Sequence, residues 1–487
     1  MADAGTDGVL DPRRWRALGV AITALFMTLL DLSIVNVALP SIRDGLGAGV
    51  SEVQWVVSGY ALAFGMVPII AGRLGDDRGR RFMLLLGIAG FVLTSLVVGL
   101  APTPGVLIAG RVLQGISGGL INPQVSGLIQ QLFPRQERGR AFGVLGGAVG
   151  VATATGPVLG GAIIGLGGAD LGWRLTFLVN VPVGVASFVL CRAWLPGDPV
   201  RTTTIRRPLD LTGAGLLALG VLALLFPAVQ YDSSRDPRLA FLLLPAAAVL
   251  AAFVLWERGP AARSGYPLID LGLFRIRSYA DGLGVALLYF AAFTGTPLVL
   301  SLFLQEGLGF SALRSGLTAS SFAVGSAVSA LVGGRLVNRF GGRLLVGALG
   351  LFVVGVAGAV AVVLVLAGEV PDDRLALLLT GPLLVAGLGG GSVITPNQTL
   401  SLSEVDSVGG STAGGTLQTA QRVGSSLGTA VISAVFYAGA AGVVATGGGQ
   451  GDAGYGRAYA SSLLVAVGFS LAALGLALRS VRRRPTG

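Results

Sequence analysis

Long apolar segments recur along almost the whole of this 487-residue chain and leave only short polar stretches between them. A helix needs about 20 predominantly apolar residues to cross the hydrocarbon core of a bilayer. Fourteen segments of this kind can be marked in the sequence. Only 12% of the residues are charged, which is far below the share usual in soluble domains. The sequence therefore predicts an all-α integral membrane protein with 14 transmembrane helices.

The arginines predict the orientation of these helices. All 34 basic residues are arginine, and most lie in every second polar stretch. Arginine-rich loops stay on the cytoplasmic side of a membrane, so both termini are expected to be cytoplasmic, in a bacterial inner membrane. The polar N-terminus precedes an apolar run too long for a signal sequence, so no cleaved leader is expected.

Two polar stretches resemble each other and indicate an internal repeat. GRLGDDRGRR begins at Gly72 and GRLVNRFGGR begins at Gly334, and each follows the second helix of a possible six-helix set. Parallel repeats of six helices are one of the standard transporter architectures. The predicted organisation is an N-terminal six-helix bundle (1–194), a linker with two extra transmembrane helices (195–278), and a C-terminal six-helix bundle with a basic tail (279–487).

The composition excludes several classes of function. The chain has no histidine and one cysteine, Cys191, which rules out an intramolecular disulfide and a cysteine-rich metal site. No nucleophile constellation is visible, so we expect neither an enzyme nor a cofactor or metal. The arginines are dispersed, which argues against nucleic-acid binding. Because histidine is the usual proton carrier near neutral pH, any proton chemistry must use carboxylates or water.

Three charged residues lie well inside predicted spans: Asp31, Arg111 and Arg422. Charges at this depth are costly and usually face a cavity or a partner. At 1.5 Å per residue, Asp31 lies about 20 Å from the inner face, and Arg111 lies roughly 9 Å from the outer face of a core about 30 Å thick. The two therefore share a depth, and they could pair directly or through water. Arginine favours the ionised acid while burial opposes it, which suits a protonation switch; a permanent structural ion pair is the alternative.

Polar and small residues form stripes on three predicted helices. The fourth helix carries Arg111, Gln114 and Asn122 at helical spacing. The thirteenth carries a stripe with Gln418, Gln421 and Ser425, and Arg422 lies in the same segment. These stripes suit the walls of an aqueous cavity, although glycine-mediated packing or interhelical hydrogen bonding would produce them as well. The fifth helix has a stripe of small residues interrupted by Pro157, which is expected to kink it.

Several motifs, in order, resemble those of the major facilitator superfamily, in its fourteen-helix drug:proton antiporter group. They are LLDLSIVNVALP in the first helix, GRLGDDRGRR in the loop after the second, RVLQGISGG in the fourth and GPVLGG in the fifth. The resemblance covers nearly the whole chain. It implies two bundles that alternate access to a central cavity, with drug export driven by proton import.

The resemblance also implies roles for individual residues. Asp31 would be the protonation site, Arg111 would couple it to the cavity, and Asn36 would join the cavity residues. The antiporter hinge and the conformational latch would each comprise four residues: Gly156, Pro157, Gly160 and Gly161 for the hinge, and Gly72, Asp76, Gly79 and Arg80 for the latch. The second loop departs from the motif because Asn338 stands where the first has Asp76, so a weaker latch is expected there.

The substrate is expected to be a small lipophilic molecule, since the spans offer few polar groups. With one deep acid, the cavity favours neutral, zwitterionic or monocationic compounds over dications. The alternatives are a passive facilitator, a proton symporter of a small metabolite, and an exporter of a lipid-like compound. Protons and the bilayer are the other expected partners, and the protein is expected to act as a monomer.

Overall fold

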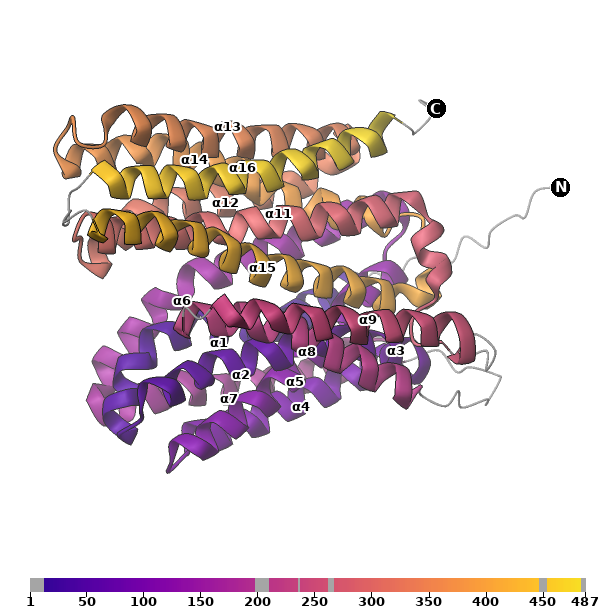
Figure 1. Ribbon diagram of the computed structural model, residues 1–487. Coiled ribbons are helices and arrows are strands. Elements are labelled where there is room, and N and C mark those ends of the chain that lie inside the picture. The colour runs from indigo at the N-terminus through magenta and orange to yellow at the C-terminus, as the bar shows by residue number, and fades with distance from the viewer. Residues whose placement is uncertain (1–12, 198–209, 235–236, 262–266, 446–452, 483–487) are drawn as a thin grey trace.

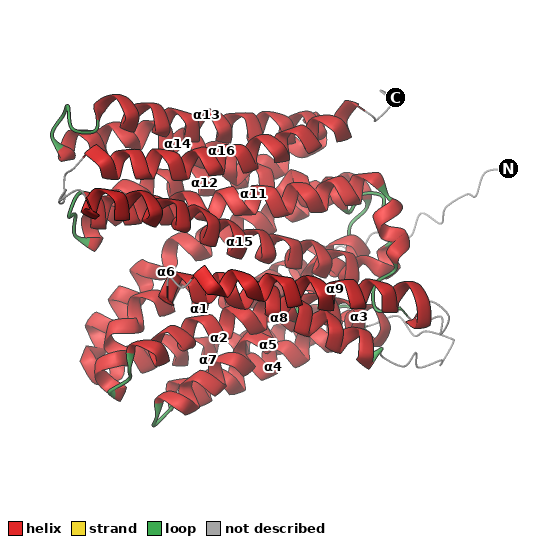
Figure 2. Cartoon of the chain, in the orientation of Figure 1, coloured by secondary structure: helices red, strands yellow, loops and turns green. Residues whose placement is uncertain are grey.

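The computed structural model describes residues 13–197, 210–234, 237–261, 267–445 and 453–482. Regular structure in these ranges is helical, apart from one isolated bridge between Ala367 and Val370. The helices lie side by side in two stacked groups, which correspond to the two halves of the chain (Figure 1; Figure 2).

The N-terminal half contains seven helical stretches in the described residues. They are α1 (Arg14–Leu46), α2 (Val50–Met66), α3 (Pro68–Arg78), α4 (Arg80–Gly99), α5 (Pro104–Leu132), α6 (Arg135–Leu178) and α7 (Asn180–Trp194). Prolines help to set two of these boundaries, since Pro68 and Pro104 begin α3 and α5, where a missing N–H has no consequence. Thr103 caps α5 by accepting a hydrogen bond from the Val106 amide.

The linker and the C-terminal half follow. The linker contains α8 (Leu211–Ser234), η1 (Pro237–Leu242), α9 (Leu243–Trp256), η2 (Glu257–Ala261) and η3 (Leu271–Arg275). The C-terminal half contains α11 (Arg277–Leu302), η4 (Phe303–Gly307), α12 (Ala312–Phe340), α13 (Gly342–Leu366), α14 (Asp372–Ser401), η5 (Ser407–Gly409), α15 (Gly410–Ala445) and α16 (Ala453–Arg482).

Among the described residues, ten helices are long and apolar enough to cross a membrane, or eleven if α2 and α3, bent by 46°, form one span. This confirms a multi-pass membrane protein but not the predicted count of fourteen. Three further predicted spans are not counted among these helices. For α6 and α8 only parts are described in full, and these include the apolar stretches Val158–Gly168 and Leu211–Pro227. Helix α9 has 14 residues.

The two resembling loops adopt related turns. Gly79 separates α3 from α4 with φ 108°, and Gly341 separates α12 from α13 with φ 51°. These left-handed values favour glycine over residues with a Cβ. The repeat detected in the sequence thus coincides with a glycine of positive φ after the second membrane segment of each half.

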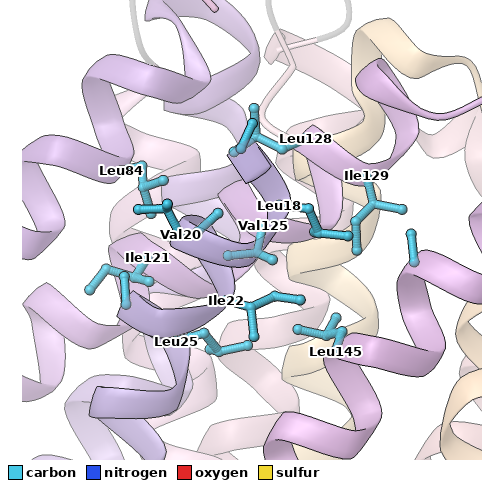
Figure 3. Packing of buried hydrophobic residues seen from close by; sticks show 14 of the residues in the cluster. Leu18, Val20, Ile22, Leu25, Leu84, Ile121, Val125, Leu128, Ile129 and Leu145 are labelled. Carbon is cyan, nitrogen blue, oxygen red and sulfur yellow. The ribbon is translucent and has the colours of Figure 1, made fainter. Parts of the chain in front are cut away.

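One large apolar cluster connects the two halves. Within the N-terminal half it joins α1, α4, α5 and α6 through side chains such as Leu18, Leu84, Val125 and Leu145 (Figure 3). It also includes Tyr279, Leu402, Val405 and Ala413 of the C-terminal half. This cluster lies toward the end of the molecule where α1 begins and α16 ends, which we call the terminus end (Figure 1).

The linker helices lie across the seam between the two halves (Figure 1). Helix α8 packs against both α2 and α15, through apolar residues that include Leu62, Leu217 and Val423. Asp210 fixes the start of α8 by accepting hydrogen bonds from the Gly213 amide and the Trp256 indole, each at 2.8 Å. The linker therefore forms part of the wall between the halves.

Candidate functional site

Asp31 of α1 and Arg111 of α5 form a buried ion pair inside the N-terminal bundle. Arg111 Nη1 lies 2.5 Å from Asp31 Oδ2, and both side chains are fully buried. The sequence placed the two residues at a similar depth, and the structure brings their side chains into direct contact. A buried pair of this kind needs further hydrogen bonds to offset the loss of hydration.

Two neutral polar residues, Asn180 and Gln114, supply those bonds, and a third, Ser95, holds Gln114. Asp31 Oδ1 accepts from Asn180 Nδ2 at 2.8 Å and from Gln114 Nε2 at 3.3 Å. Gln114 Oε1 accepts from Arg111 at 2.7 Å, and Gln114 Nε2 also donates to Ser95 Oγ. Gln114, predicted as a cavity residue, therefore lies in the ion-pair network. Asn180 and Ser95 were missed by the sequence analysis, because nothing in their own segments distinguishes them.

Arg111 makes contacts beyond Asp31, although one of its nitrogens has none. Its Nε donates to the Val56 carbonyl at 3.1 Å, and its guanidinium lies 4.1 Å from the centroid of the Tyr60 ring. The Nη2 atom is buried without a hydrogen-bond partner. A buried donor without a partner is costly, so this guanidinium gains from any rearrangement that brings an acceptor to Nη2.

Tyr60 contacts Arg111 of the ion pair and also lines a cavity. Its ring stacks on Phe64 with centroids 5.7 Å apart, and its hydroxyl donates to the Thr28 carbonyl at 3.0 Å. Both rings line a cavity of about 90 Å³ between α1, α2, α8 and α15. It is lined by Leu32, Tyr60, Ala61, Leu62, Phe64, Leu225, Arg422, Ser425 and Ser426.

The other predicted cavity residues lie elsewhere. The side chain of Asn36 is outside the described part of the structure. Asn122 and Gln421 are half-buried and do not line this cavity. Gln418 is buried and donates from Nε2 to Ser126 Oγ at 3.3 Å, which joins α15 to α5. Of the polar residues singled out on the fourth and thirteenth predicted helices, Arg422 and Ser425 line this particular cavity.

Three of the four predicted latch residues, Gly72, Asp76 and Arg80, contact the C-terminal half at the terminus end. Asp76 accepts hydrogen bonds from the Ser411 amide at 3.1 Å and from the Thr412 amide and hydroxyl at 2.8 Å each. These donors belong to the first turn of α15, where the helix dipole also favours an anion. Arg80 holds Asp76 at 2.7 Å and donates to the Ser407 carbonyl.

The two latch glycines allow this contact. A Cβ on Gly72 would lie 2.3 Å from the Ser411 carbonyl oxygen, so only glycine lets α3 and α15 approach this closely. Gly79 ends α3 and donates its amide to the Gly75 carbonyl. For Asn338, which replaces the acid in the second loop, the side chain is outside the described part of the structure.

A second contact between the halves joins α6 to α12. A Cβ on Gly143 would lie 2.5 Å from the Gly334 Cα, so the two backbones touch. Nearby, Thr395 donates to the Phe142 carbonyl at 3.4 Å. Together with the latch, this contact holds the two halves together at the terminus end.

The α6–α12 contact gives a testable expectation. Gly143→Ala places a methyl group against the backbone of the other half. This overpacking should destabilise the arrangement with the closed terminus end by about 1–3 kcal/mol. We expect slower export and a lower Tm in detergent. Gly150→Ala is the matched control on the same helix, because its Cβ would meet Ala327 Cα at an ordinary 3.4 Å. Equal behaviour of the two variants would contradict the assignment.

The predicted hinge residues lie where α6 meets α1. A Cβ on Gly156 would lie 2.3 Å from Ser33, and one on Gly160 would lie 3.2 Å from the Ile34 carbonyl, whereas Gly161 faces open space. The side chain of Pro157 is outside the described part of the structure, and α6 is helical through that position. The helix leaves helical dihedral angles at Gly168, with φ 70° and ψ −177°.

Comparisons with known proteins agree with this architecture. The sequence profile of the Major Facilitator Superfamily matches residues 21–429. The probable actinorhodin transporter of Streptomyces coelicolor is 38% identical over 427 residues, which cover 87% of this chain and 73% of that protein. The puromycin resistance protein pur8 of Streptomyces alboniger is 34% identical over 428 residues, covering 87% and 82%.

A solved structure has the same fold. The crystal structure of the human organic anion transporter MFSD10 aligns with a TM-score of 0.66 and 17% identity, over 96% of this chain and 100% of that one. Identity this low shows likeness of fold alone. The family profile and the relatives together establish that this chain belongs to the major facilitator superfamily and is a membrane transporter rather than an enzyme.

Proposed function

We propose that this transporter exports lipophilic drugs or antibiotics by proton-coupled antiport across the bacterial inner membrane. The resistance and antibiotic-transport names of its relatives support the substrate class. One structural observation carries the coupling: a carboxylate, Asp31, is fully buried at membrane depth and is held by Arg111, Gln114 and Asn180. Intramembrane acids of this kind are the usual proton carriers of transporters.

The proposed cycle begins with the terminus end closed. The latch around Asp76 and the α6–α12 contact at Gly143 both tie the two halves together there. If the terminus end is cytoplasmic, as the arginine distribution favours, this arrangement is closed to the cytoplasm. A proton taken up by Asp31 from outside neutralises the acid and weakens its bond to Arg111. The released guanidinium then moves toward another hydrogen-bond acceptor, and its contact with Tyr60, which stacks on Phe64, transmits the movement to the cavity.

The proton shifts the balance between two arrangements only because each arrangement binds it with different affinity. The hinge at Gly156, Pro157, Gly160 and Gly161 would let α6 move along α1 while the latch opens. Fourteen spans follow if the first part of α6, together with α8 and α9, also crosses the bilayer. The transporter then acts as a monomer and uses the proton gradient as its only energy source.

The test is transport by the purified protein in proteoliposomes, with a panel of dyes and antibiotics. In inside-out orientation, an acidic lumen should drive accumulation of substrate in the lumen, and collapse of the pH gradient should abolish the accumulation. Equilibration without accumulation would indicate a passive facilitator. Accumulation of substrate in the lumen only when protons also flow into the lumen would indicate a symporter. Either result would overturn the proposal.

A further inference from the structure

Arg422 lies at a depth where a charged side chain needs a partner. It follows the first residue of α15, Gly410, by twelve positions, or about 18 Å of helix in a hydrocarbon core about 30 Å thick. Its guanidinium lies 4.7 Å from the centroid of the Phe64 ring. Among the described residues, no carboxylate comes within ion-pair distance of it.

The other deep charges do not compensate Arg422. Asp31 is fully buried against Arg111, and neither residue is among those that line the cavity. The charge that faces the cavity is therefore positive. An unpaired guanidinium at this depth is costly, so the cavity favours an occupant that brings a negative charge.

The surroundings of Arg422 are suited to an anionic group on an apolar molecule. Ser425 and Ser426 lie beside it in the cavity wall, and Phe64, Leu32 and Leu225 supply apolar surface. A guanidinium offers a planar fork of donors that matches a carboxylate, and the Phe64 ring under it helps to fix its orientation. The volume of about 90 Å³ suits such a group rather than a whole drug molecule.

We infer that Arg422 forms an anion subsite, and that the substrates include amphiphiles that carry a carboxylate or an ionised phenol on an apolar body. This inference rests on the proposed function, since it names the substrate class of the exported compounds. It changes the expectation from sequence, which counted Asp31 as the deep charge available to a substrate. In the structure Asp31 is instead paired with Arg111, and the charged residue that lines the cavity is Arg422.

Two dyes with one xanthene framework and opposite charge test the inference: fluorescein, an anion, and rhodamine 123, a cation. Binding to the purified protein is measured by fluorescence polarisation in a zwitterionic detergent. Arg422→Gln should raise the Kd for fluorescein by about tenfold or more, as expected when a charge-assisted bond is lost, and should leave or lower that for rhodamine 123. Arg422→Lys should retain most of the affinity for fluorescein.

Arg457→Gln is the matched control, because it removes the same charge from an exposed position of α16. Its two Kd values should equal those of the wild type. Equal weakening of both dyes by Arg422→Gln, or no change in either, would overturn the inference and leave Arg422 a packing partner of Phe64. Displacement of fluorescein by phosphatidylglycerol but not by a soluble aromatic carboxylate would also overturn it, in favour of a lipid site.

The binding assay needs no proton gradient, so the two proposals can fail separately. Arg422-dependent binding of fluorescein without gradient-driven transport would refute antiport and keep the anion subsite. Gradient-driven export of rhodamine 123 without Arg422-dependent binding of fluorescein would refute the anion subsite and keep antiport.

Discussion

Asp31→Asn is expected to reduce gradient-driven accumulation of substrate to the level of empty vesicles. Asparagine keeps the shape of the side chain and its acceptor oxygen, but it cannot take up or release a proton. Downhill movement of substrate should continue, because the cavity and the contacts between the halves do not involve Asp31. Both rates are measured in the same proteoliposomes, with and without an acidic lumen.

A second variant separates lost coupling from lost folding. Asp31→Asn leaves Arg111 as a buried charge without its counterion, and breaking a buried pair can cost about 3–5 kcal/mol. Arg111→Gln combined with Asp31→Asn removes both charges and should recover the lost Tm, yet remain uncoupled. Accumulation against a gradient by either variant would rule out Asp31 as the proton carrier.

Asp76→Asn should release the terminus end and shift the protein toward the state in which that end is open. The substitution keeps the size of the side chain but removes the charge that binds the first turn of α15 and Arg80. Hydrogen bonds to charged groups contribute about 1.5–3 kcal/mol each. A loss of about 2 kcal/mol changes the ratio of the two states roughly thirtyfold.

Pulsed electron paramagnetic resonance can measure this shift. The only cysteine, Cys191, is buried, so Cys191→Ser provides a background for spin labels at Asp44 and Gln305, two exposed positions at the opposite end of α1 and in η4. Asp76→Asn should shorten the distance between the labels. Asp281→Asn, at the start of α11 in the other half, should not. An unchanged distance distribution for Asp76→Asn would show that the latch does not set the ratio of the states with the terminus end closed and open.

The sequence predicted the features that depend on local hydrophobicity and on residue type. Apolar length predicted the membrane helices, and counting residues along two helices predicted that Asp31 and Arg111 lie at similar depth. The count of fourteen spans depended on weaker segments. The first part of α6 and the end of α8 are only partly described, and α9 is only 14 residues long.

Features created by packing between distant segments were not predictable. Asn180 follows an ordinary apolar run and becomes a ligand of Asp31 only because α7 packs on α1. Gly143 and Gly334 are two glycines among 78, and no local pattern indicates that their backbones touch. The surroundings of Arg422 depend in the same way on Phe64 of α2 and Leu225 of α8, which a single sequence does not place.

The most direct test of the account measures proton movement itself. Proteoliposomes containing a trapped pH-sensitive dye and no initial pH gradient are given an outward gradient of a substrate identified in the transport panel. Antiport through Asp31 predicts that the wild type acidifies the lumen as substrate leaves, and that Asp31→Asn releases substrate without a pH change. Substrate efflux from the wild type with no change in internal pH, or acidification that persists in Asp31→Asn, would contradict the account.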